Sequence, residues 1–63
     1  MDDHMREQVT NILKESMDQG GDIGARATAF SLMKGIIEDG RSMSHQMRDL
    51  EDIVYIWKSF ENE

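Results

Sequence analysis

The chain has 63 residues, no cysteine and no proline, and its 13 acidic and 7 basic residues give a net charge of −6. The lack of cysteine excludes disulfides and thiolate metal sites, and the negative charge disfavours binding to nucleic-acid phosphates or anionic membranes. So short a chain buries only about 60% of its unfolded surface, and we therefore expect a partner to supplement its core.

The first predicted element is an amphipathic helix over residues 3–19. Asp2 and Asp3 precede it and favour the start of a helix, because a carboxylate can accept the free N–H groups there. Gly20 and Gly21 are expected to end it in a left-handed C-terminal cap. Apolar residues recur every three or four positions, the period of one helix face: Met5, Val9, Ile12, Leu13 and Met17.

The second predicted helix spans residues 22–39, with Asp22 as its N-cap and Gly40 after its end. Apolar residues cover much of its circumference, which is typical of a central helix. Small residues form a narrow stripe at spacings of four, three and four: Gly24, Thr28, Ser31 and Gly35. Each interior glycine costs about 0.5–1 kcal/mol, so we interpret the stripe as a close-packing face for another helix, with solvent exposure as the alternative.

The third predicted helix spans residues 43–61 and begins after a cap at Ser42 or Ser44. Its apolar stripe comprises Met43, Met47, Leu50, Val54 and Trp57, widened by Ile53, Ile56 and Phe60. Short connections between helices favour antiparallel neighbours. The sequence therefore predicts a single all-α domain over residues 1–63, built as a three-helix antiparallel bundle.

The predicted bundle has more apolar surface than one short chain can bury. The second helix is apolar on several sides, and the third carries aromatic residues near its end. A self-complementary homodimer would cover this surface. The residues expected to mediate self-association are Phe30, Ile37, Leu50, Val54, Trp57 and Phe60.

No motif in the sequence predicts catalysis, a metal site or a cofactor site. His4 lies among acidic residues at the chain start, where no second shell would fix a metal ligand. Ser42, Ser44, His45 and Asp49 offer the residue types of a hydrolytic group. Three short helices offer no pocket in which these groups and oxyanion donors would converge. The GGDIG sequence at residues 20–24 lacks the spacing of a phosphate-binding loop.

The leading functional prediction is a non-enzymatic module that forms a homodimer and binds and modulates another protein. Its partner surface is expected at Asp49, Asp52 and Tyr55, where acidic side chains favour a basic protein, with nucleic-acid mimicry left open. The alternative is a small helix-turn-helix transcriptional regulator that reads DNA with the third helix. In that register Gln46 and Asp49 would occupy positions that need apolar residues.

The sequence predicts a cytoplasmic protein. No apolar run approaches the roughly 18 residues of a membrane span, and the acidic start is unlike a signal peptide. In size and helical build the chain is similar in kind to small accessory proteins of bacteria and their phages, a similarity that depends on no motif.

Overall fold

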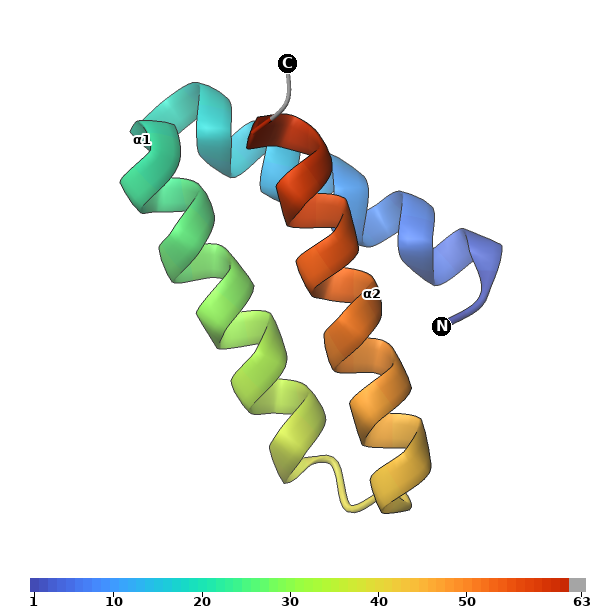
Figure 1. Cartoon of the computed structure of the whole chain (residues 1–63). Coiled ribbons are helices and arrows are strands. Elements are labelled where there is room, and N and C mark those ends of the chain that lie inside the picture. The colour runs from blue at the N-terminus through green and yellow to red at the C-terminus, as the bar shows by residue number, and fades with distance from the viewer. Residues whose placement is uncertain (62–63) are drawn as a thin grey trace.

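The computed structural model describes residues 1–61, and this part of the chain is entirely helical apart from its ends and one connection (Figure 1). Helix α1 spans Asp3–Glu38 and helix α2 spans Met43–Glu61. Residues 1–61 contain no strand. The predicted all-α class is confirmed.

A kink at Gly21 divides α1. This residue has φ 66° and ψ −157°, a backbone conformation that is essentially restricted to glycine. We call residues 3–20 the N-terminal arm and residues 22–38 the C-terminal arm. The structure corrects the expected three-helix bundle, because the chain turns within one helix at a single residue and no loop separates the arms.

The helix ends follow the sequence in part. Asp2 caps α1 as predicted, since its Oδ1 accepts a hydrogen bond from the Met5 N–H at 2.8 Å. Asp22 instead pairs with Arg26 at 3.0 Å, one turn further along the C-terminal arm. Gly40 adopts φ 76° after the end of α1, which lets the chain reverse toward α2.

The core lies where the two arms and α2 meet. Leu13 is completely buried, and Ile53 retains 1% of its exposure. Small residues on the C-terminal arm allow the backbones to approach. The buried cluster consists of Val9, Leu13, Ala29, Ile53 and Ile56, with Met1, Leu32, Met33, Ile36, Trp57 and Phe60 packed against it.

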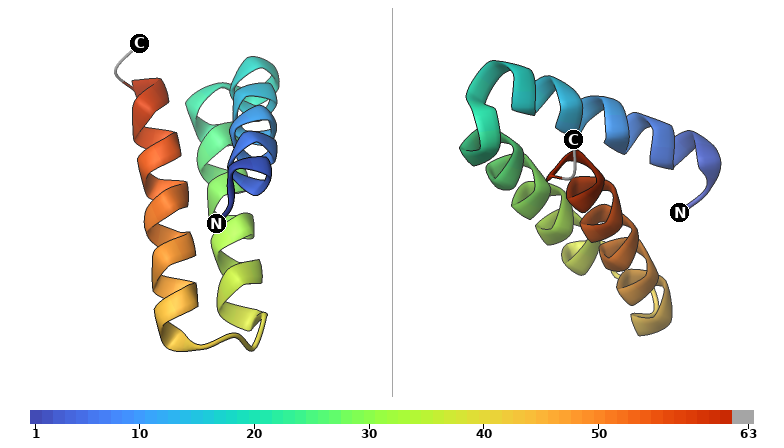
Figure 2. Two further views of the ribbon diagram at one scale, coloured as in Figure 1. Left: turned by 90° about the vertical axis from the view of Figure 1, so that its right-hand side faces the viewer. Right: turned by 45° about the horizontal axis from the view of Figure 1, so that its top comes forward.

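The C-terminal arm and α2 form an antiparallel hairpin, and the N-terminal arm crosses one side of it (Figures 1 and 2). In Figure 1 this arm passes behind α2, so the viewer looks at the side of the hairpin that the arm leaves uncovered. Among the described residues, neither helix is long and apolar enough to cross a membrane.

Candidate interaction surface

A stripe of apolar side chains on α2 faces solvent. Met43, Met47, Leu50 and Val54 follow at spacings of four, three and four, which places them on one side of the helix. Met43 is 72% exposed and Met47 51%. A shallow groove of about 370 Å³ runs along this stripe, lined by Met47, Leu50, Glu51, Val54, Tyr55 and Lys58.

The C-terminal arm carries three exposed large apolar residues: Ile23 at its start, 82% exposed, and further along Phe30 and Ile37, 70% and 58% exposed. Phe30 and Ile37 are seven positions apart, which is two helical turns, and so lie in line along the arm, with Ile23 seven positions before Phe30. Phe30 is next to α2, because it shares a small pocket of about 30 Å³ with Trp57. The Gln46 side chain reaches across from α2 to donate a hydrogen bond to the Ile37 carbonyl at 3.3 Å.

Both sets of residues point away from the N-terminal arm. Thr28 contacts that arm through Ser16, and Phe30 lies about 160° further around the same helix. On α2, Asp52 contacts Arg6 of the arm, and Val54 is again about 160° away. These apolar residues, all exposed except the half-buried Leu50, therefore share the uncovered side of the hairpin. We call this surface the apolar face and define it as Phe30, Ile37, Met43, Met47, Leu50 and Val54.

The apolar face includes four of the residues predicted to mediate self-association, namely Phe30, Ile37, Leu50 and Val54. The other two, Trp57 and Phe60, pack against the core of their own chain and are only partly exposed. The Arg26 guanidinium lies 5.3 Å from the centroid of the Trp57 ring, within range of a cation–π contact. This packing removes much of both aromatic side chains from any interface.

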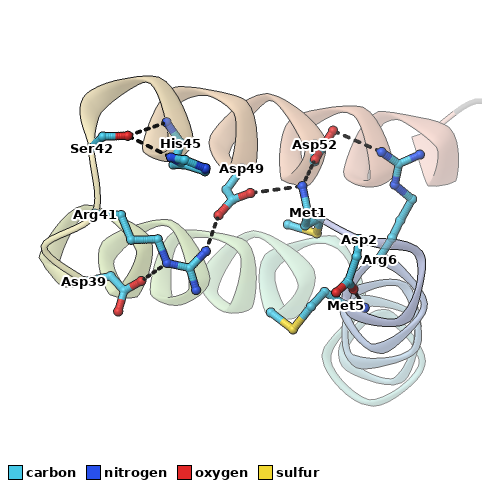
Figure 3. A network of polar contacts seen from close by, with 10 residues as sticks. All are labelled: Met1, Asp2, Met5, Arg6, Asp39, Arg41, Ser42, His45, Asp49 and Asp52. Atoms are coloured by element: carbon cyan, nitrogen blue, oxygen red, sulfur yellow. Dashed lines mark hydrogen bonds and ion pairs between the residues drawn. The ribbon is translucent and has the colours of Figure 1, made fainter.

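Two acidic residues predicted to face a partner are instead engaged inside the molecule. The Met1 α-ammonium contacts Asp52 Oδ2 at 2.8 Å and Asp49 Oδ1 at 3.1 Å (Figure 3). Arg6 pairs with Asp52 at 3.3 Å, and Arg41 approaches Asp49 at 3.5 Å. Together these groups form a charge network that ties the chain start and the interhelical connection to α2.

The network predicts a loss of stability at alkaline pH. Hydrogen bonds to Asp52 and Asp49 raise the pKa of the Met1 α-ammonium above its ordinary value of 8.0. A raised pKa in the folded state means that the contribution to stability is complete below pH 8.0 and disappears as the pH rises through the folded value. Urea titrations across this range should show a declining unfolding midpoint.

The matched control for this pH effect is the same chain with an acetylated N-terminus, which carries no titrating charge there. Its unfolding midpoint should decline less over the same alkaline interval. Equal declines for the two chains would show that the Met1 ion pairs do not contribute to the pH dependence.

Tyr55 remains accessible, with 75% of its surface exposed. It lines the groove along the apolar stripe and also a second shallow depression with Arg6, Glu51 and Asp52. Of the predicted partner residues, Tyr55 is therefore the most accessible. Glu51 is the neighbouring acidic side chain that the sequence analysis did not select.

The small-residue stripe on the C-terminal arm is divided into two halves. A Cβ on Gly24 would lie 2.9 Å from the Ser16 carbonyl oxygen, and the Thr28 and Ser16 hydroxyls are 2.8 Å apart. This half packs against the N-terminal arm. The other half, Ser31 and Gly35, makes no close helix contact in the single chain. Ser31 is exposed, and a Cβ on Gly35 would meet nothing within 4 Å.

The polar residues considered for chemistry serve local structure. The Ser42 hydroxyl is 2.8 Å from His45 Nδ1 and lies near the start of α2, all on an exposed surface. Asp49, the acidic member of that group, contacts the Met1 ammonium and Arg41 (Figure 3). His4 pairs with Gln8 at 3.3 Å. Residues 1–61 contain no group of three or more His, Cys, Asp or Glu side chains that could hold a metal ion.

The sequence pattern does not predict the Met1 ammonium and Arg41 as partners of Asp49. No local sequence pattern predicts these ion pairs, because they join residues that come together only in the folded hairpin. The Arg26–Trp57 contact is of the same kind.

The chain was also compared with known proteins. No family model, curated protein or solved structure matches it. The inference of function therefore depends on the surface itself.

Proposed function

We propose that this chain is a non-enzymatic protein-interaction module that works as a homodimer and binds and modulates another protein. The observation that supports this most is the apolar face, which gathers six large apolar side chains on the side of the hairpin without the N-terminal arm. Contiguous exposed apolar surface of this kind marks association sites, whereas single exposed apolar residues are ordinary.

A second copy of the chain is a suitable occupant of this face. Two hairpins placed face to face about a two-fold axis would bring apolar side chains of one copy onto those of the other. Burying a large aliphatic or aromatic side chain contributes about 1.5–3 kcal/mol relative to leaving it in water. The methionines among these residues have flexible side chains that fill irregular gaps between packed surfaces.

The surface around Tyr55 and Glu51 is proposed as the site for the modulated protein. It borders the apolar face, because Glu51 and Tyr55 also line the groove along the α2 stripe, and it would lie at the rim of a face-to-face dimer. An exposed tyrosine offers a large contact area at little entropic cost, as in many binding surfaces. The net charge of −6 favours a partner of basic character.

The geometry lends no support to the DNA-binding alternative. Recognition helices of the helix-turn-helix type cross the preceding helix at about 90–120° after a short turn. Here α2 runs back antiparallel beside the C-terminal arm (Figure 1). Asp49, Glu51 and Asp52 also place carboxylates on the helix that would have to approach phosphates.

Charge introduced into the apolar face should prevent face-to-face pairing of two chains. Phe30→Asp and Val54→Asp are each expected to weaken the dimer by at least about a hundredfold, because an unpaired carboxylate would be buried. Sedimentation velocity over a series of protein concentrations measures this change. The control is Ser31→Asp, which adds the same charge to an exposed position of the C-terminal arm, about 100° around the helix from Phe30.

Several outcomes would contradict the proposal. A wild-type chain that sediments as a monomer at millimolar concentration would remove the homodimer. Duplex-DNA binding that weakens steeply with added salt would favour the transcriptional regulator. Self-association of the acidic chain should instead be maintained or strengthened by salt, since screening reduces the repulsion between its two copies.

A further inference from the structure

The arrangement of α1 depends on one residue. Gly21 is the only residue inside this helix with non-helical backbone angles, and regular helix continues directly on both sides. Its φ of 66° with ψ of −157° is a strained choice for any residue with a side chain. Helical angles at Gly21 alone would therefore convert the two arms into one straight helix.

A straight α1 would remove the N-terminal arm from its own core. Thirty-six residues of continuous helix measure about 54 Å. The longest dimension of the folded chain is 33 Å. The arm would then extend beyond the hairpin, and Val9 and Leu13 would leave the buried cluster.

All the contacts that hold the arm are made with residues beyond the kink. Leu13 and Val9 pack with Ala29, Ile53 and Ile56, so the buried part of the arm docks on the hairpin. The Ser16 hydroxyl bonds to Thr28, and the polar contacts at the start of the chain reach Asp49 and Asp52. A second copy of the arm carries the same side chains and can make each of these contacts.

We propose that two copies of this chain exchange their N-terminal arms by straightening at Gly21. In the exchanged dimer each arm occupies the site on the partner hairpin that it occupies on its own hairpin in the closed chain. The core contacts are retained, and the backbone at Gly21 becomes helical. Concentration then controls the balance between the closed chain and the exchanged dimer.

Arm exchange uses the opposite side of the hairpin from the apolar face and does not depend on the proposed function. The two modes of association are separable for this reason. Phe30→Asp should abolish face-to-face pairing and leave arm exchange intact.

The first test compares alanine at the two adjacent glycines. Gly21→Ala disfavours the kink and favours continuous helix, so its dimer should be at least about tenfold tighter than that of the wild type. Gly20→Ala is the control, because Gly20 lacks a positive φ and its added Cβ would meet nothing within 4 Å. Both are measured in the Phe30→Asp background by sedimentation velocity and circular dichroism. A Gly21→Ala chain that is helical and monomeric at all concentrations would overturn the exchange.

The second test traps the arm without altering the kink. The Ser16 and Thr28 hydroxyls are 2.8 Å apart, so Ser16→Cys with Thr28→Cys places two thiols together across the arm and hairpin. Oxidation of the closed chain links one chain to itself, whereas oxidation of the exchanged dimer links two chains. Denaturing gels without reductant distinguish these products.

The fraction of chains joined to a second chain by a disulfide should rise with the protein concentration during oxidation. The same rise should be seen when the chain also carries Phe30→Asp. Ser16→Cys with Ser44→Cys measures random collision, because Ser44 lies at the start of α2, far along the chain from the arm. Exclusive intrachain linkage at every concentration would refute the exchange, even if Gly21→Ala fails to fold. The two modes of association would not be independent if the chain with only the cysteine pair formed interchain disulfides while addition of Phe30→Asp abolished all self-association.

Discussion

Leu13→Ala is expected to leave a large part of the protein unfolded at 25 °C. Leu13 retains none of its exposure and joins the N-terminal arm to the core of the hairpin. Truncation of a buried leucine costs about 2.7–5 kcal/mol, because transfer energy is lost and a cavity remains. A domain of this size rarely has more than about 3–5 kcal/mol of stability, so the two quantities are comparable.

Circular dichroism during urea and thermal unfolding measures this loss. The control is Ile12→Ala, at the adjacent position on the same arm, where the side chain is 44% exposed. Its effect should be clearly smaller, because less apolar surface leaves contact with the protein. Equal destabilisation by the two variants would mean that the N-terminal arm does not dock through the face described.

Alanine at Gly24 and at Gly35 should change stability in opposite directions. Both residues lie in the C-terminal arm, where alanine favours helix over glycine by about 0.8–1 kcal/mol. The new Cβ at Gly24 would lie 2.9 Å from the Ser16 carbonyl oxygen, and this backbone atom moves only if the N-terminal arm shifts. Overpacking of this kind costs about 1–3 kcal/mol, which exceeds the gain in helix propensity.

The Cβ at Gly35 would meet nothing within 4 Å, so Gly35→Ala keeps the gain in propensity. Its melting temperature should rise by about 4–8 °C for each kcal/mol gained in a domain of this length, and that of Gly24→Ala should fall. The measurement is made at low protein concentration, where association contributes least. A stabilised Gly24→Ala would show that the two arms are further apart than described. A destabilised Gly35→Ala would show that another surface packs against Ser31 and Gly35.

Arm exchange and face-to-face pairing would give this small chain two independent ways to recruit a second copy. The first reuses the buried contacts of the core, and the second covers the apolar face. Both modes would stabilise a chain with so small a core, because a second copy supplies apolar contacts that the single chain lacks.

The candidate surface was only partly predictable. The apolar periodicity predicted that Phe30, Ile37, Leu50 and Val54 mediate self-association. All four lie on the apolar face. The same periodicity selected Trp57, whose neighbours on the C-terminal arm reduce its exposure. Asp49 and Asp52 were assigned to a partner surface, yet the Met1 ammonium, 48 or more residues away in sequence, engages both (Figure 3).

The sequence by itself determined the helical class, the capping role of Asp2 and the turning points at Gly21 and Gly40. These features are local: they depend on the period of apolar residues and on the torsion angles that glycine allows. Tertiary structure alone decided that the first turn is a kink within α1, that Gly24 is packed while Gly35 is open, and that Asp49 and Asp52 face inward. Each of these outcomes depends on which side of the hairpin the N-terminal arm crosses, and that is set by packing between residues far apart in the chain.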